Sequence, residues 1–300
     1  MKHTLFACAL LMIGAAGQSA DAASTDQLPD DAQWYLHVDL DAMRKSPVGR
    51  ELYSWLDQEV FEDLRDDADF DPNKELDSVV AYSNSQGHAT ALLTGKLRQA
   101  SKDKLLAAMT ASGSLQIEKQ GGIDYYRVDD LNLENTELDI DQETLYFSFD
   151  RDNTIVFSTR LDDMIDATRG NAKRRGEKGT LLRLSAERSL LQAGLDAAAL
   201  GENASERWNS GMFRQARQLA FVFSERKGNA DLRLRVTADD QQTTDSLAAV
   251  VRGLIGLYAL SGEQDPQVTP LLNSLDVSTD DEGLSLQLNV PADTLIGLIN

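Results

Sequence analysis

The chain has 300 residues, of which 42% are hydrophobic and 26% charged, and its formal net charge is −20. This length and apolar content are enough for one large domain or two domains of typical size. The strong negative charge speaks against nucleic acid as a partner and against unassisted binding to anionic lipid.

Residues 1–22 have the pattern of a secretory signal peptide. Lys2 precedes an apolar run from Leu5 to Ala16, and Ala20-Asp21-Ala22 is a small-x-small cleavage site. The run is shorter than the roughly 20 residues that a transmembrane helix needs. Cleavage would also remove Cys8, the only cysteine, and leave no disulfide. We expect a periplasmic or secreted protein that is not an integral membrane protein after signal cleavage.

The first part of the mature chain alternates strands and helices. Trp34, Leu36 and Val38 share one face of the first strand, and Tyr35 and His37 share the other. A helix is expected to begin at Ser46-Pro47, with the serine as its cap. The expected elements that follow are a hairpin (77–83 and 89–97), a helix (102–111), two hairpins (114–119 and 123–128; 145–149 and 155–159) and a helix (161–168).

A similar order of elements follows a short basic segment. Residues 169–179 contain three glycines and five basic residues and are expected to be a linker. After it come a strand (181–185), a helix (187–200), a hairpin (219–225 and 231–237), a helix (239–262), a hairpin (275–278 and 284–290) and a helix (291–299).

These patterns predict an α+β protein made of two related halves. The expected domains are a first α+β repeat (23–168) and a second repeat (180–300), joined by the basic linker 169–179. Each half is expected to be an antiparallel sheet of hairpins packed on helices, in the order strand-helix-hairpin-helix-hairpin-helix. The extra hairpin near Ile123 has no counterpart in the second half.

The segment 239–262 is the longest apolar helical pattern of the mature chain. Between Leu247 and Leu260 only Arg252 is charged. We expect Gly253 and Gly256 to allow close approach to a neighbouring element. The buried residues of this structural spine are expected to be Leu247, Val250, Val251, Leu254, Leu257 and Tyr258.

Charge is unevenly distributed along the chain. In residues 23–168, 31 acidic residues against 13 basic ones give −18, whereas 17 against 15 give −2 in residues 169–300. This division fits electrostatic pairing of the halves or of subunits, a cationic partner for the first half, or simple solubility.

No pattern in the sequence identifies a catalytic site. Only His37 and His88 remain after processing, and no serine lies in a G-x-S-x-G turn. Acidic residues are too abundant to single out a pair of the kind that glycosidases use. We therefore predict no catalytic, cofactor-binding or metal-binding residues and no cofactor.

The acidic loop 66–77 resembles a calcium loop only in part. Oxygen-bearing side chains recur at every second position from Asp67 to Glu75, but Pro72 replaces the turn glycine and Ser78 the bidentate glutamate. A solvated acidic loop is the alternative.

We expect the protein to bind a protein or a cell-envelope component without being an enzyme. One alternative is an exported carboxylate-dependent hydrolase, which requires a cleft where two acids converge, one with a raised pKa. Another is an apolar-ligand carrier, which requires a cavity beside residues 254–258.

Overall fold

The structure is a computed structural model. It describes residues 32–61, 70–84, 86–112, 114–129, 144–170, 179–188, 216–260 and 268–299. The expected signal peptide lies outside the described residues, as do most of the expected linker and most of the expected helix 187–200. The proposed domain boundaries at these segments stay predictions.

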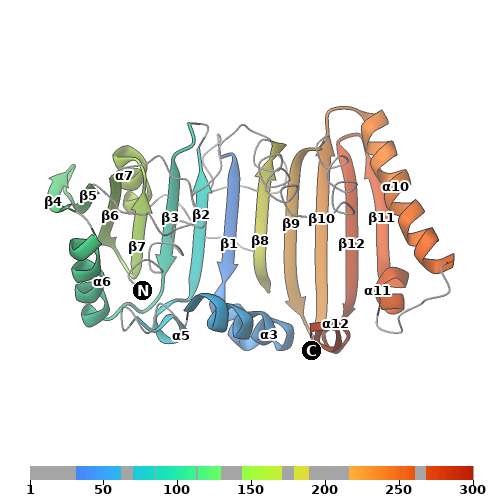
Figure 1. Cartoon of the computed structure of the whole chain (residues 1–300), viewed down its shortest axis with the longest axis horizontal. Coiled ribbons are helices and arrows are strands. Elements are labelled where there is room, and N and C mark those ends of the chain that lie inside the picture. Colours follow the sequence, from blue (N-terminus) through green and yellow to red (C-terminus); the bar gives the residue numbers. More distant parts are fainter. Residues whose placement is uncertain are drawn as a thin grey trace.

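The described strands form one antiparallel sheet of twelve strands (Figure 1). From edge to edge their order is β11-β12-β10-β9-β8-β1-β2-β3-β7-β6-β5-β4. Their bounds are β1 Trp34–Asp39, β2 Ser78–Ser83, β3 Ala89–Thr94, β4 Ser114–Gln120, β5 Ile123–Asp129, β6 Thr144–Arg151, β7 Thr154–Ser158, β8 Thr180–Glu187, β9 Ala216–Arg226, β10 Asn229–Ala238, β11 Leu275–Asp280 and β12 Gly283–Pro291.

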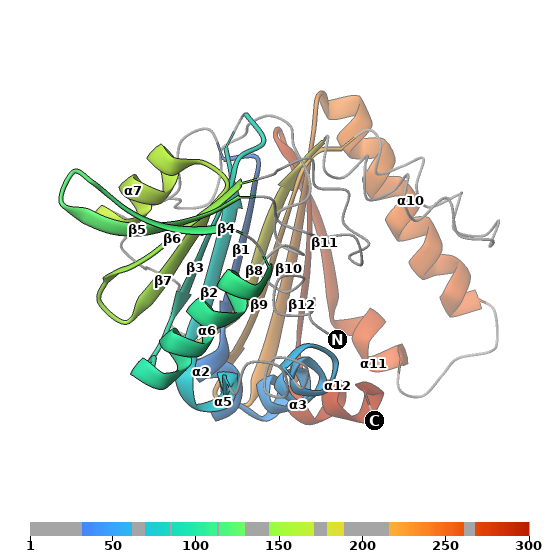
Figure 2. The same ribbon diagram turned by 60° about the vertical axis from the view of Figure 1, so that its left-hand side comes forward.

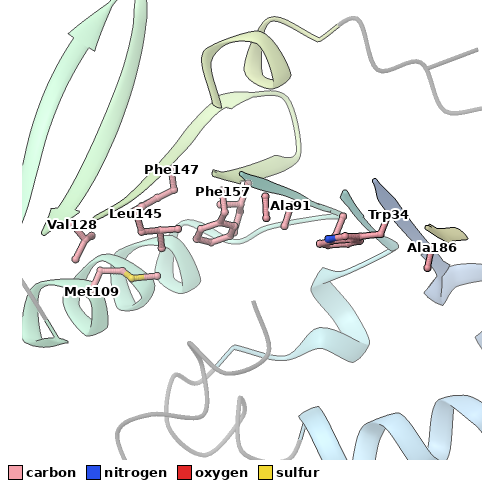
Figure 3. Packing of buried hydrophobic residues seen from close by; sticks show 11 residues of the cluster. Trp34, Ala91, Met109, Val128, Leu145, Phe147, Phe157 and Ala186 are labelled. Carbon is pink, nitrogen blue, oxygen red and sulfur yellow. The ribbon is translucent and has the colours of Figure 1, made fainter. Parts of the chain in front are cut away.

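Alternation along β1 assigns side chains to the two faces of the sheet. Leu36 pairs with Ala81 on β2 and with Leu184 on β8, so these apolar residues share one face. We call it the Trp34 face, because Trp34 lies there, buried as predicted. Tyr35 and His37 point to the opposite face, which we call the Tyr35 face. Figure 3 shows the core on the Trp34 face.

Helices cover both faces and one end of the sheet. Helix α6 packs on the Trp34 face near β5 and β6, α10 packs on the same face near β10 and β12, and α7 packs on the Tyr35 face (Figure 2). Ser46 caps α3 as predicted, its Oγ accepting from the Gly49 N–H at 3.2 Å. The bounds are α2 Leu40–Lys45, α3 Pro47–Leu56, η1 Asp57–Phe61, α5 Pro72–Glu75, α6 Gln99–Ser112, α7 Leu161–Arg169, α10 Gln241–Leu260, α11 Val268–Ser274 and α12 Ala292–Ile299.

The prediction of two halves, each with its own sheet, is wrong. Strands β1 and β8 pair with each other, so the sheet continues from one expected half into the other. A hydrophobic core also crosses this joint, because Val48 and Val79 share one cluster with Leu181 and Phe223. The Val48 N–H donates to Glu225 Oε2 at 2.9 Å. Local hairpin patterns do not reveal such long-range pairing, and the elements form one 12-stranded sheet.

The helix predicted at 239–262 is present as α10, but its burial differs from the prediction. Thr244, Leu247 and Ala248 are buried, whereas Leu254 is 42% and Leu257 is 66% exposed. The described chain has no atom within 4 Å of a Cβ added at either glycine of the helix, so the expected close approach is absent. Only the first half of the helix packs on the sheet. None of the described helices is long and apolar enough to cross a membrane.

Candidate ligand site

A polar turn joins β2 to β3 at one end of the sheet. Asn84 organises it: its Oδ1 accepts hydrogen bonds from the backbone N–H groups of Gln86 and His88, each at 3.0 Å. Asparagine is favoured at such positions because its side chain can satisfy backbone groups two to four residues ahead. The turn therefore holds the Gln86 and His88 backbone in place.

The start of α7 lies beside this turn because β7, the strand before it, pairs with β3. In that pair Thr90 is opposite Ser158, and their hydroxyl oxygens are 3.0 Å apart. Ser158 Oγ also accepts from the Arg160 N–H at 3.2 Å, at the beginning of the helix. Gly170, with φ of 80°, ends α7 in a conformation that favours glycine.

A polar cavity of about 350 Å³ lies between the turn and α7. This volume is at the lower end of the range for small-molecule sites, which is about 300–1,000 Å³. Its lining residues come from β2, the turn, β3 and the start of α7: Tyr82, Asn84, Gln86, His88, Thr90, Arg160, Asp162, Asp163 and Asp166. We call this cavity the hairpin pocket.

Negative charge predominates in the hairpin pocket. Three aspartates line it against one guanidinium, that of Arg160. Arg160 Nη1 donates to Gln86 Oε1 at 2.6 Å, and its Nη2 lies 3.5 Å from Asp162 Oδ2. Asn84 Nδ2 donates to Asp163 Oδ2 at 2.9 Å. Among the lining residues the carboxylates outnumber the guanidinium by two, and Arg169, outside the lining, has its Nη1 4.0 Å from Asp166 Oδ1. The lining therefore favours a positively charged ligand.

Two further side chains shape the pocket. Burial raises the pKa of Tyr82 to about 12, and the charge of Asp163 adds to this effect, so the phenol stays a neutral hydrogen-bonding group. His88 Nδ1 is buried and has no hydrogen-bond partner within the described ranges of the chain. A buried polar atom without a partner is uncommon in folded proteins, and in a pocket it is available to a ligand.

No pattern in the sequence singles out these residues. His88 was noted only as one of two histidines, and the other, His37, is buried on the Tyr35 face opposite Arg183 and Val80. Two sequence patterns mark the pocket: an Asn-x-x-Gly turn, and two adjacent aspartates at the start of a helix. Both patterns are common in proteins and do not by themselves indicate a site. The turn and the helix start lie side by side because β3 pairs with β7, about 70 residues away in sequence.

The described part of the acidic loop has structural roles. Asp71 Oδ1 accepts from the Asn73 N–H at 3.2 Å and caps α5. Asn73 Nδ2 donates to Asp57 Oδ1 at 2.9 Å. Glu75 is buried and bound by Arg98 and Ser101. Residues 62–69 lie outside the described part of the chain, and in the part described no group of three or more acidic, histidine or cysteine side chains could hold a metal ion.

The two alternative functions can be compared with this geometry. Burial raises the pKa of Glu187 to about 7, yet Glu187 does not line the hairpin pocket where the aspartates converge. The hydrolase hypothesis requires an acid with a raised pKa in the same cleft as the converging acids. In this structure Glu187 and the pocket aspartates lie in different places. Leu254 and Leu257 face solvent rather than an enclosed cavity, which removes the wall that the carrier hypothesis required.

Comparisons with known proteins assign neither a family nor a function. No family model matches the chain, and no curated protein matches it. Among solved structures, the chain is similar to crystal form III of TP0453, with a TM-score of 0.44 and 11% identity over 94% of this chain and 98% of that one. Crystal form I of TP0453 gives a TM-score of 0.45 and 11% identity over 94% and 97%. A likeness of this degree supports no further conclusion.

Proposed function

We propose that this is an exported, non-enzymatic binding protein that captures a cationic group of a protein or cell-envelope component in the hairpin pocket. The observation that carries the proposal is the excess of carboxylates in the pocket. Asp162, Asp163 and Asp166 approach one cavity from a single helix; Arg160 is the one cation of the lining, and Arg169, which does not line the cavity, pairs with Asp166 at 4.0 Å. The neutral phenol of Tyr82 and the free Nδ1 of His88 add hydrogen-bonding capacity.

A binding role fits the way the polar groups are held. Asn84 holds Asp163, and Gln86 holds Arg160, so both charged side chains have fixed positions before a ligand arrives. Such preorganisation lowers the ordering cost of binding. Export to the periplasm or beyond remains the expectation from residues 1–22, and it is part of the proposal.

Isothermal titration with agmatine tests the proposal, because this small molecule carries both an ammonium and a guanidinium group. We expect agmatine to bind, and 1,5-pentanediol and glutarate, which lack positive charge, not to bind. Replacing both Asp163 and Asp166 by asparagine should weaken binding about tenfold or more, since hydrogen bonds to charged groups contribute about 1.5–3 kcal/mol.

Asp245→Asn is the matched control for this double variant. Asp245 is exposed on α10, at the other end of the sheet, where it accepts from Gln241 Nε2 at 3.0 Å (Figure 1). This substitution removes the same kind of charge and should leave agmatine affinity unchanged. Equal binding of agmatine by wild type and the Asp163/Asp166 variant would contradict the proposal, as would equal binding of the neutral diol.

A further inference from the structure

A row of polar side chains leads from the hairpin pocket toward the middle of the sheet. The Asn84 N–H donates to His88 O at 2.9 Å, the Gln33 N–H to Ser83 O at 2.9 Å, and the Glu187 N–H to Gln33 O at 3.1 Å. The first and third bonds continue the β2–β3 and β1–β8 registers by one residue, whereas the Gln33 N–H bonds to Ser83, the residue opposite Trp34, so the β1–β2 register shifts by one residue there. Directly opposed residues share a face, and His88 is opposite Asn84 next to Tyr82, while Gln33 is opposite Glu187 next to Ser185. By alternation along β2 and β8, both pairs lie on the Tyr35 face.

Two members of this row are almost completely buried, and in the described part of the chain their side chains have no hydrogen-bond partner. Glu187 is 1% exposed and Gln33 is 2% exposed. Among the residues that the structure describes, neither the two carboxyl oxygens of Glu187 nor the amide oxygen and nitrogen of Gln33 has a hydrogen-bond partner. A buried carboxyl that lacks partners favours its protonated, neutral form.

We propose that Glu187 and Gln33 form a buried proton-binding site that regulates the affinity of the hairpin pocket for its cationic ligand. The regulatory part rests on the proposed function. Glu187 has the proton to lose, and Gln33 is the neighbouring side chain that can accept a hydrogen bond from the neutral carboxyl or donate one to the charged carboxylate. Asn84 follows Gln33 in the row and lines the pocket.

The coupling is electrostatic. Two strand spacings separate the backbones of Glu187 and Asn84, which is roughly 10 Å. At an effective dielectric constant of about 20, a unit positive charge roughly 12 Å from Glu187 shifts its ionisation equilibrium by about tenfold. Because linkage is reciprocal, loss of the Glu187 proton strengthens cation binding by the same factor. Salt screens part of this effect, so about three- to tenfold is expected at low ionic strength.

The charged and polar groups around Glu187 are few in the described structure. On β9, Gln218 lies opposite Glu187, and the charge of Arg217 opposes the rise in the Glu187 pKa. The neighbouring Arg188 is paired with Asp239. On β1, Tyr35 and His37 follow Gln33 on the same face.

The first test needs no ligand. The Glu187 pKa is raised from 4.5 to about 7, so between these values the folded protein keeps a proton that the unfolded chain has lost. The stability that this group contributes is therefore highest below about pH 4.5 and is lost as pH rises to about 7. From this group alone the unfolding constant increases about tenfold per pH unit, up to about 300-fold in total. Glu187→Gln, an isostere of the neutral acid, should lack this contribution.

The measurement is urea unfolding at pH 4.5–8.5 for both proteins. We expect the ratio of unfolding constants, wild type over Glu187→Gln, to rise by about two orders of magnitude toward pH 7.5. A ratio that stays constant would overturn the proposal whatever the pocket does. The matched control is Glu225→Gln on β9: Glu225 is buried but bonded to Val48, and its replacement leaves Glu187 intact, so the fall in stability should persist.

A measurement on wild type guards against misfolding of the variant. Carbon-13 NMR of the Glu187 carboxyl should show a titration midpoint near 7, and a midpoint below 5 would contradict the proposal.

The coupling is then tested with agmatine at low salt. Wild type and Glu187→Gln should bind equally at pH 5.5, and wild type should bind about three- to tenfold more tightly at pH 8.5. The two proteins differ only at position 187, so the comparison isolates the effect of Glu187.

The outcomes separate the two proposals. If stability responds to Glu187 as expected but agmatine binds at no pH, the proton site stands, and the proposed function and its regulation both fall. If agmatine binds with an equal pH profile in both proteins, the proposed function stands and the regulation by Glu187 is refuted.

Discussion

At the scale of single residues, Glu75 shows how this protein keeps a buried carboxylate charged. Its side chain is 1% exposed. The Arg98 backbone N–H donates to Oε2 at 3.0 Å, and the Arg98 guanidinium and the Ser101 hydroxyl donate to Oε1. Burial alone would raise the pKa of Glu75, but these hydrogen bonds outweigh it and lower the pKa. Glu187 is equally buried but has no hydrogen-bond partner among the described residues, and its pKa shifts in the opposite direction.

Replacing Arg98 by alanine should destabilise the protein by about 3 kcal/mol, because it leaves a buried charge without its partner. Urea unfolding at pH 7 measures this loss. Lys45→Ala is the control: Lys45 pairs with Asp41 on the surface of α2, and exposed pairs contribute at most about 1 kcal/mol. Equal small effects of the two substitutions would show that the Arg98–Glu75 contact does not stabilise the protein.

At the scale of elements, patterns in the sequence located strands and helices better than they located burial. Alternation around Trp34 predicted β1 and the burial of Trp34 correctly, but Leu36 and Val38 of the same face are only half-buried, and His37 of the predicted polar face is buried. Helix α10 was also predicted, but apolar content does not say how much of a helix the sheet can cover. Strands β10, β12 and β11 cover its first half, and residues such as Leu257 and Leu260 stay exposed.

Alanine substitution at Gly253 and Gly256 tests this account of α10. An added Cβ meets no described atom at either position, and alanine is favoured over glycine in helices, so each substitution should stabilise the protein by up to about 1 kcal/mol. Thermal unfolding measures the change. Gly49→Ala in α3 is the matched control: its Cβ would collide with Ser46 and Met43, and it should destabilise the protein. Destabilisation by the α10 substitutions would show that something packs against those glycines.

At the scale of the whole molecule, pairing between distant segments determines both the sheet and the hairpin pocket. Neighbouring strands such as β2 and β3 follow from a local turn, which the sequence predicts. The pairs β1–β8 and β3–β7 join segments far apart in the chain, and no local pattern specifies them. The first pair merges the two expected halves, and the second creates the pocket. Both therefore escaped prediction for the same physical reason.

The measurement that tests the central claim most directly is NMR mapping of agmatine binding on the full mature chain. Backbone amide signals should shift with saturation in two stretches, residues 82–90 around the β2–β3 turn and residues 160–166 at the start of α7, because these stretches line the pocket. Signals of α10 should stay in place. Shifts centred elsewhere, or no saturable shifts, would contradict the claim that the hairpin pocket binds a cationic ligand.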